Sequence, residues 1–164
     1  MTKPPDPEEL TENNKRSLTR LERAIALSQG QFSLILVCCN HLPLRLQVVK
    51  HLEEVCSVPI ETLTLHSSVN TLFTTIHTAL EGLPPALMVF GLESVVAIDQ
   101  ALSATNLVRD EFRKQFPFPL IVWINDDILQ KLVRLAPDFH SWAAPPIRFE
   151  VPKNQALERI VIMV

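Results

Sequence analysis

Glycine and basic charge are both scarce in this chain. Only three of its 164 residues are glycine (Gly30, Gly82 and Gly91), so few loops can adopt a positive φ or bring the backbone close to a ligand. The formal net charge is −3 and the isoelectric point is about 5.9. This balance excludes the strong positive field typical of proteins that bind nucleic acids or anionic membranes.

Disulfides, membrane spans and metal sites are also not indicated. There are three cysteines, and the adjacent pair Cys38-Cys39 is poorly placed to bridge, so we expect buried, inert thiols and a reducing compartment. No apolar run is long enough to span a membrane, and the polar, proline-rich start is no signal peptide. The histidines are scattered with no i,i+4 pair, and the adjacent cysteines lack the two-residue spacing of zinc ligands. We therefore expect a soluble, cytoplasmic protein without metal or cofactor.

The composition is that of a globular domain, with 47% hydrophobic and 20% charged residues. We expect a polar, disordered tail over residues 1–12 and a single α/β domain over 13–164. Continuous apolar runs of four to six residues alternate with segments of helical periodicity, which indicates a three-layer sandwich on a mostly parallel sheet of about five strands. The end, 157–164, reads as helix or strand, either cut short or buried on the sheet. The expected strands are 33–38, 61–65, 86–90, 120–124 and 147–151, and the expected helices are 13–28 (capped by Asn13 or Asn14), 43–55, 69–83, 95–116 and 126–135 (capped by Asp126 or Asp127).

The turn after the first strand reads Cys38-Cys-Asn-His-Leu-Pro-Leu-Arg45. In a nucleotide-binding α/β domain a phosphate would lie in this turn, held by converging backbone N–H groups of glycines and by a lysine. The turn has neither residue, and Pro43 within it suits the first turn of the next helix. The scaffold of such a domain is therefore predicted without its phosphate-binding loop.

Three stretches carry a resemblance to a known family. They are Pro117-Phe-Pro-Leu-Ile-Val-Trp-Ile, the element Ala136-Pro-Asp-Phe-His-Ser-Trp142, and Ile147-Arg-Phe, supported by Ser17-Leu-Thr-Arg-Leu-Glu-Arg-Ala-Ile and Val37-Cys-Cys-Asn. With them the chain, from about Asn13 to Val151, resembles the P-loop-NTPase-like domain near the N-terminus of cyanobacterial and actinobacterial multidomain proteins, often ahead of tetratricopeptide repeats.

The resemblance implies a P-loop-NTPase-like topology and a role in signalling. Relatives among signal-transduction ATPases would have an acidic pair after the third strand and a polar sensor after the fourth. Here Gly91 stands at the expected magnesium-aspartate position, Glu93 is the one carboxylate left to mimic the catalytic acid, and Asn125 stands at the sensor position. The Walker motifs are thus degenerate, and ATP hydrolysis is not expected.

Ligands of open α/β sheets bind beyond the carboxyl ends of the strands. The polar residues expected at this rim could hold a small ligand, or they could cap helices and close turns. A hydrolase or ligand-binding domain using Asn40, His41, Glu93 and Asn125 is the alternative to an inactive module, and it requires these side chains to face one pocket. A response-regulator receiver is set aside, because it needs acids after the first and third strands. The candidate rim residues are Asn40, His41, Glu93, Asn125 and Asp126.

Phe139 and Trp142 stand in the distinctive turn after the last predicted helix. They are either a hydrophobic plug that holds this helix on the sheet or a docking knob for a neighbouring domain. The function expected from the sequence is a catalytically inactive NTPase-like module that serves as a protein-interaction or regulatory domain. Its partner would be a protein, such as a helical-repeat domain or a second copy of the chain.

Overall fold

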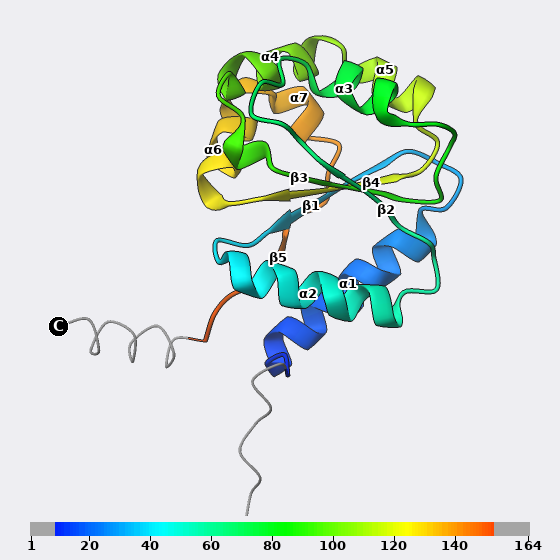
Figure 1. Ribbon diagram of the computed structural model, residues 1–164, viewed down its shortest axis with the longest axis vertical. Coiled ribbons are helices and arrows are strands. Elements are labelled where there is room, and N and C mark those ends of the chain that lie inside the picture. The colour runs from blue at the N-terminus through cyan, green and yellow to red at the C-terminus, as the bar shows by residue number, and fades with distance from the viewer. Residues whose placement is uncertain (1–8, 153–164) are drawn as a thin grey trace, which may run out of the picture.

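The computed structural model describes residues 9–152, which form five strands and seven α-helices in three layers (Figure 1). The sheet has the order β2-β3-β4-β1-β5 and every pairing is parallel. The predicted three-layer α/β sandwich is therefore confirmed. The strands are β1 (Ser33–Cys38), β2 (Glu61–Thr64), β3 (Leu87–Phe90), β4 (Pro119–Ile124) and β5 (Ile147–Arg148), and the helices are α1 (Glu12–Leu27), α2 (Leu42–Val55), α3 (Leu72–Ala79), the 3₁₀ helix η1 (Leu92–Ser94), α4 (Ile98–Leu107), α5 (Arg109–Gln115), α6 (Asp126–Leu135) and α7 (Pro137–His140).

Helices cover both faces of the sheet. Helices α1 and α2 lie on one face and α3 to α7 on the other (Figure 1). Alternate residues of β1 enter the two cores: Ile35 and Val37 pack toward α1 and α2, whereas Leu34 and Leu36 pack toward the opposite layer. Burial on both faces explains why the central strands are continuously apolar.

The N-terminal boundary differs from the sequence prediction. Thr11, not Asn13 or Asn14, is the N-cap of α1 and accepts the N–H of Asn14 at 3.2 Å. Leu10, placed in the polar tail by the sequence, is buried in the core. The Asn14 side chain instead makes two hydrogen bonds to the backbone of Glu150, 3.0 and 3.1 Å long.

The long helix predicted over 95–116 is two helices. The first ends at Leu107, α5 begins at Arg109, and Val108 between them has a ψ of 19°. Two side chains favour this break: the Thr105 hydroxyl donates to the Ala101 carbonyl at 2.9 Å, and Arg109 Nη1 donates to the Asn106 carbonyl at 2.7 Å. The Thr105 bond gives the Ala101 carbonyl a second donor beside the helical N–H, an arrangement that often bends helices, and the Arg109 bond satisfies a carbonyl of the last helical turn.

Other boundaries shift by a few residues. The helix expected over 69–83 is shortened to α3, and the strand expected over 147–151 is a two-residue β5 whose pairing extends through a bond from the Phe149 N–H to the Cys38 carbonyl (3.0 Å). The N-cap of α6 is Asn125 and not Asp126 or Asp127. The segment 157–164 lies outside the described residues.

Candidate functional site

The carboxyl ends of β1 and β4 form one polar cluster around Asp126. Its Oδ1 accepts a hydrogen bond from Arg148 Nη1 at 2.8 Å, and its Oδ2 accepts one from Asn40 Nδ2 at 2.7 Å. In return, the backbone N–H of Asp126 donates to Asn40 Oδ1 at 2.8 Å. These hydrogen bonds, that from Arg148 first, lower the pKa of Asp126 to about 2. The carboxylate is ionised and paired at neutral pH.

The two adjacent cysteines lie on opposite faces of the sheet, as alternation along a strand requires. Cys38 packs in the core beneath α3 to α7 and Cys39 in the core above α1 and α2. Burial, followed by the Cys38 Sγ–H bond to Asp126 Oδ1 (3.3 Å), raises the pKa of Cys38 to about 11. Burial also raises the pKa of Cys39. Both thiols are therefore protonated at neutral pH, and neither has the low pKa of a nucleophile.

Arg45 is a site residue that the sequence analysis missed. Its side chain is 5% exposed and its Nη1 lies 2.6 Å from Oε1 of Glu93, which comes from η1 at the end of β3. The guanidinium also lies 5.8 Å from the centroid of the Trp123 ring. Among the described residues, Arg45 Nε and Trp123 Nε1 are buried without a hydrogen-bond partner.

Helical periodicity is the signal that could have identified Arg45 from the sequence. It precedes Val48 by three residues and Leu52 by seven, so it shares the inward face of α2 with them. An arginine at an inward position needs a buried acceptor, and Glu93 supplies it.

Gly91 has a conformational reason to be glycine. Its φ is +93°, in the left-handed region, and a Cβ built there would lie 3.0 Å from the Leu65 carbonyl oxygen. This close approach turns the chain from β3 into η1. The residue at the position expected for a magnesium aspartate is thus one that the backbone restricts to glycine.

Two predicted rim residues are helix caps. His41 is the N-cap of α2, and its Nδ1 accepts the N–H of Leu44 at 3.2 Å. Asn125 is the N-cap of α6, and its Oδ1 accepts the N–H of Ile128 at 2.9 Å. Local capping is a sufficient reason for both residue types at these positions.

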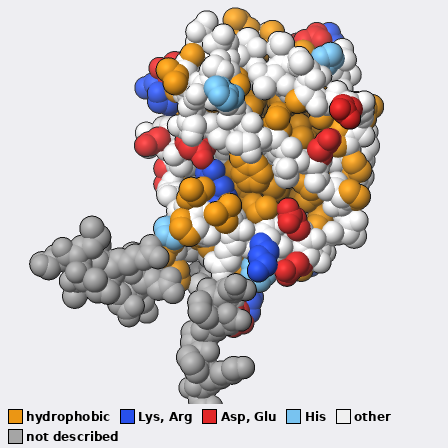
Figure 2. All heavy atoms as spheres, viewed as in Figure 1, with side chains coloured by type: hydrophobic (Ala, Val, Ile, Leu, Met, Phe, Trp, Pro, Cys, Tyr) orange, Lys and Arg blue, Asp and Glu red, His pale blue; other side chains and the backbone are white. Residues whose placement is uncertain are grey.

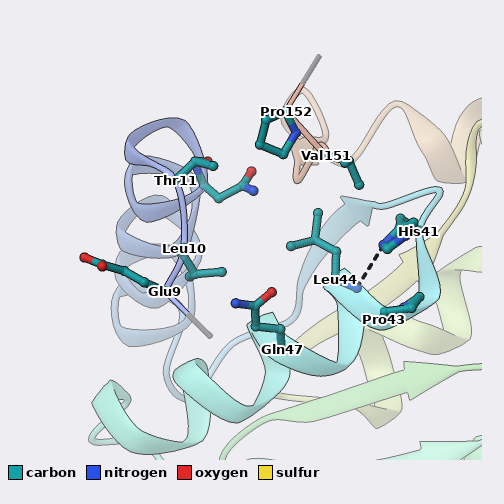
Figure 3. Close-up of a pocket in the computed structure, with 10 residues that line it drawn as sticks. Glu9, Leu10, Thr11, His41, Pro43, Leu44, Gln47, Val151 and Pro152 are labelled. Carbon is teal, nitrogen blue, oxygen red and sulfur yellow. Dashed lines mark hydrogen bonds between the residues drawn. The ribbon is translucent and has the colours of Figure 1, made fainter. Parts of the chain in front are cut away.

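The five predicted rim residues therefore fall into separate groups. Asn40 and Asp126 bond to each other, Glu93 bonds to Arg45, and His41 and Asn125 cap helices. His41 lines a pocket of about 230 Å³ between the start of α1, the start of α2 and Pro152 (Figure 3). The other four predicted residues are not among those that line this pocket.

Phe139 and Trp142 pack on the helix layer. Phe139 is 2% exposed, and its ring centroid lies 4.8 Å from that of Phe112. Trp142 is half-buried: Phe32 meets it edge-on at 6.2 Å, and the Arg113 guanidinium stacks over it at 3.8 Å. These contacts are those of a plug that holds α7 against α5.

No group of three or more His, Cys, Asp or Glu side chains within residues 9–152 is arranged to hold a metal ion. None of the described helices is long and apolar enough to cross a membrane. No protein-family model matches the chain, and no curated protein or solved structure matches it either. The resemblance to P-loop-NTPase-like domains accordingly stays a prediction from sequence.

Proposed function

We propose that this domain is a catalytically inactive NTPase-like module that serves as a protein-interaction or regulatory domain. The observation that carries the proposal is the internal pairing of charges at the carboxyl rim. Arg45 pairs with Glu93, and Arg148 pairs with Asp126. Both cations are thereby held by carboxylates of the same chain, whereas a nucleotide site would direct cations at phosphate oxygens.

The strand order supports the same proposal. Strand β1 lies inside the sheet between β4 and β5, so the turn that follows it is at the place where open α/β sheets bind ligands. The residues in that turn do not fit a nucleotide: Cys39 and His41 stand where glycines would expose backbone N–H groups, and no lysine reaches outward. The Gly91 backbone leaves no room for a metal-binding carboxylate at that position.

Exposed apolar side chains are compatible with an interacting protein. Figure 2 shows hydrophobic side chains gathered near the middle of one face, with charged side chains around them. Surfaces of this kind favour contacts with other proteins when they form contiguous patches. Large hydrophobic side chains of the described residues that are exposed are Leu27, Leu42, Leu46, Val55, Leu83, Val96, Leu107, Val108 and Val133.

The hydrolase alternative has no observation in its favour. It requires Asn40, His41, Glu93 and Asn125 to converge on one pocket, and two of these side chains bond to the first turn of their own helices. The Cys38 thiol is buried and has a raised pKa, so it does not supply a nucleophile for a hydrolase either.

Calorimetric titration with ATP and with ADP, each in the presence of magnesium, tests the proposal. We expect no heat of binding up to millimolar nucleotide. The variant Asp126→Asn, which releases Arg148 from its carboxylate, serves as a second sample and is also expected to show none. Magnesium-dependent binding of the natural chain at micromolar nucleotide would overturn the proposal.

A further inference from the structure

One edge of β1 is open along part of its length. Strand β1 pairs with β4 from Ser33 to Cys38, but β5 pairs with it only at Val37 and Cys38. The Cys39 N–H donates to Ile124 of β4, and the Cys38 carbonyl accepts from Phe149 next to β5. Alternation then turns the N–H and C=O of Leu34 toward the side of β5, where no described strand reaches them.

A groove of about 430 Å³ lies along this open edge. Leu34 and Leu36 of β1 form part of its floor. Leu27 of α1 lines one side, and Trp142 and Pro145, in the segment that leads to β5, line the other side. Leu27 is 80% exposed. The groove therefore combines apolar side chains on both sides with backbone groups of β1 that pair with no described strand.

The α1 wall of the groove is basic. Arg20 and Arg23 both line it, both are exposed, and neither makes an ion pair within the part of the chain that the structure describes. They stand on one helix at i and i+3, so their guanidinium groups project in similar directions. In a chain of net charge −3, these two guanidinium groups lie beyond ion-pair distance of every carboxylate in the described residues.

We propose that this groove binds an extended, acidic segment of a partner protein, which adds a short strand beside β1 at Ser33–Leu36. Backbone hydrogen bonds to a strand edge provide affinity, and the alternate side chains of the added strand provide specificity. Alternate side chains of the segment would face opposite sides of the sheet, so that an apolar side chain of one face meets Leu27 and one of the other face meets Trp142. A carboxylate at the α1 side would meet Arg20 and Arg23. Four residues of free edge correspond to roughly 13 Å of strand.

An added strand explains the combination of features better than a helix does. A helix satisfies its own backbone groups and would leave the N–H and C=O of Leu34 unpaired in the interface. An extended segment pairs both and fits an edge that ends at Ile147, where β5 begins. This inference rests on the proposed interaction function and assigns a place and a chemical class to the partner.

The probe is a phage-displayed library of random ten-residue peptides, selected on the full chain. Selected peptides are synthesised, and their dissociation constants are measured for the natural chain, Arg23→Glu and Arg16→Glu. Arg16 is an exposed arginine of the same helix that does not line the groove, so its variant matches the change of charge. Amide hydrogen exchange at Leu34 locates the bound peptide.

We expect the selected peptides to contain acidic residues between apolar ones. Their binding should weaken on the order of tenfold in Arg23→Glu and change little in Arg16→Glu, and exchange at the Leu34 amide should slow when peptide is bound. The proposed binding in the groove would be overturned by peptides that bind without acidic residues, that leave the Leu34 amide unprotected, or whose affinity is the same for Arg23→Glu. A selection that yields no binder would overturn it too. Peptides that bind another face would reject the groove and leave the interaction function standing, because the domain would still bind a protein segment, whereas nucleotide calorimetry tests the lack of nucleotide binding separately.

Discussion

At several single positions of the rim, the residue type is explained by the backbone conformation or by a helix cap and not by a catalytic or binding role. Gly91 stands where the resemblance places a magnesium-binding aspartate, yet its φ of +93° and its approach to Leu65 are a sufficient reason for glycine. His41 and Asn125 are polar because helices begin beside them. His41 and Asn125 thus accept hydrogen bonds from backbone N–H groups of the helices that they cap.

The variant Gly91→Ala tests the conformational reason. We expect it to lower the free energy of unfolding by about 1–3 kcal/mol, because alanine is strained at this φ and its Cβ would meet the Leu65 carbonyl. Urea unfolding measures the change. Gly82→Ala is the matched control: a Cβ there meets nothing within 4 Å, so this variant should be neutral or slightly more stable. Equal stability of Gly91→Ala and the natural chain would contradict the argument.

The thiols offer a second test at the residue scale. Cys38 and Cys39 are buried and have raised pKa values, whereas Cys56 is partly exposed. We expect iodoacetamide to alkylate Cys56 of the folded protein first at neutral pH, because thiolate and access are both required. Mass spectrometry of peptides gives the order, and the protein unfolded in guanidinium controls for intrinsic reactivity. Faster alkylation of Cys38 would identify a reactive thiol.

At the scale of elements, a buried ion pair joins α2 to η1. Arg45 reaches from the first turns of α2 to Glu93, and Glu93 is 27% exposed at its side chain. The pair connects two segments that both follow strand ends, so it holds the β1–α2 turn against the end of β3. A buried pair of this kind contributes little net stability over apolar residues, but loss of one partner leaves a charge without compensation.

The variant Glu93→Ala should therefore be more harmful than Arg45→Met. We expect a loss of about 2–3 kcal/mol for Glu93→Ala, below the range for fully buried pairs because Glu93 is partly exposed, and a loss under about 1.5 kcal/mol for Arg45→Met. Urea unfolding of both variants and of the double variant completes a double-mutant cycle. The exposed pair Lys131–Asp99 is the control, and Asp99→Ala should leave stability nearly unchanged, because solvent screens an exposed pair. A smaller effect of Glu93→Ala than of Asp99→Ala would refute the role of the buried pair.

At the scale of the whole molecule, the last described strand is held by polar bonds from both helix layers. Arg148 of β5 bonds to Asp126 at the start of α6, and Asn14 of α1 bonds to Glu150 directly after β5. Strand β5 has only two paired residues, so these side chains extend its attachment to the sheet. The integrity of this edge thus depends on the ionisation of Asp126.

This dependence predicts a contribution of Asp126 to acid stability. The pKa of Asp126 is about 2 in the folded protein and about 3.9 in an unfolded chain. The folded state therefore binds fewer protons, and the stabilisation is fully present above the unfolded value and lost as the pH falls through about 2. Because both side chains of the Asp126–Arg148 pair are nearly half exposed, we expect no more than about 1 kcal/mol.

Urea unfolding as a function of pH measures this contribution. The stability difference between the natural chain and Asp126→Asn should shrink as the pH falls from neutral toward about 2. Asp127→Asn controls for the removal of a neighbouring carboxylate, since Asp127 is exposed and has no ion pair within residues 9–152. A difference for Asp126→Asn that stays constant with pH would show that the carboxylate does not act through its charge.

Prediction from sequence succeeded where one periodicity dominates. The apolar runs of β1, β3 and β4 indicated central strands, and the structure confirms them because burial on both faces demands such runs. Boundaries failed where a side chain overrides the local pattern, as Thr105 and Arg109 do between α4 and α5. The partners of the rim residues were not predictable, because Asn40 and Asp126 are 86 residues apart in the chain.

The sequence by itself determined the layers, the parallel sheet and the lack of a phosphate-binding turn, because these follow from hydrophobic period and local residue type. Only the tertiary structure decided what the rim residues do. It directs Arg45 inward to Glu93 and joins Asp126 to Arg148, and it leaves part of the β1 edge unpaired by any strand of residues 9–152. These outcomes depend on contacts between segments far apart in the chain, which local physical preferences do not encode.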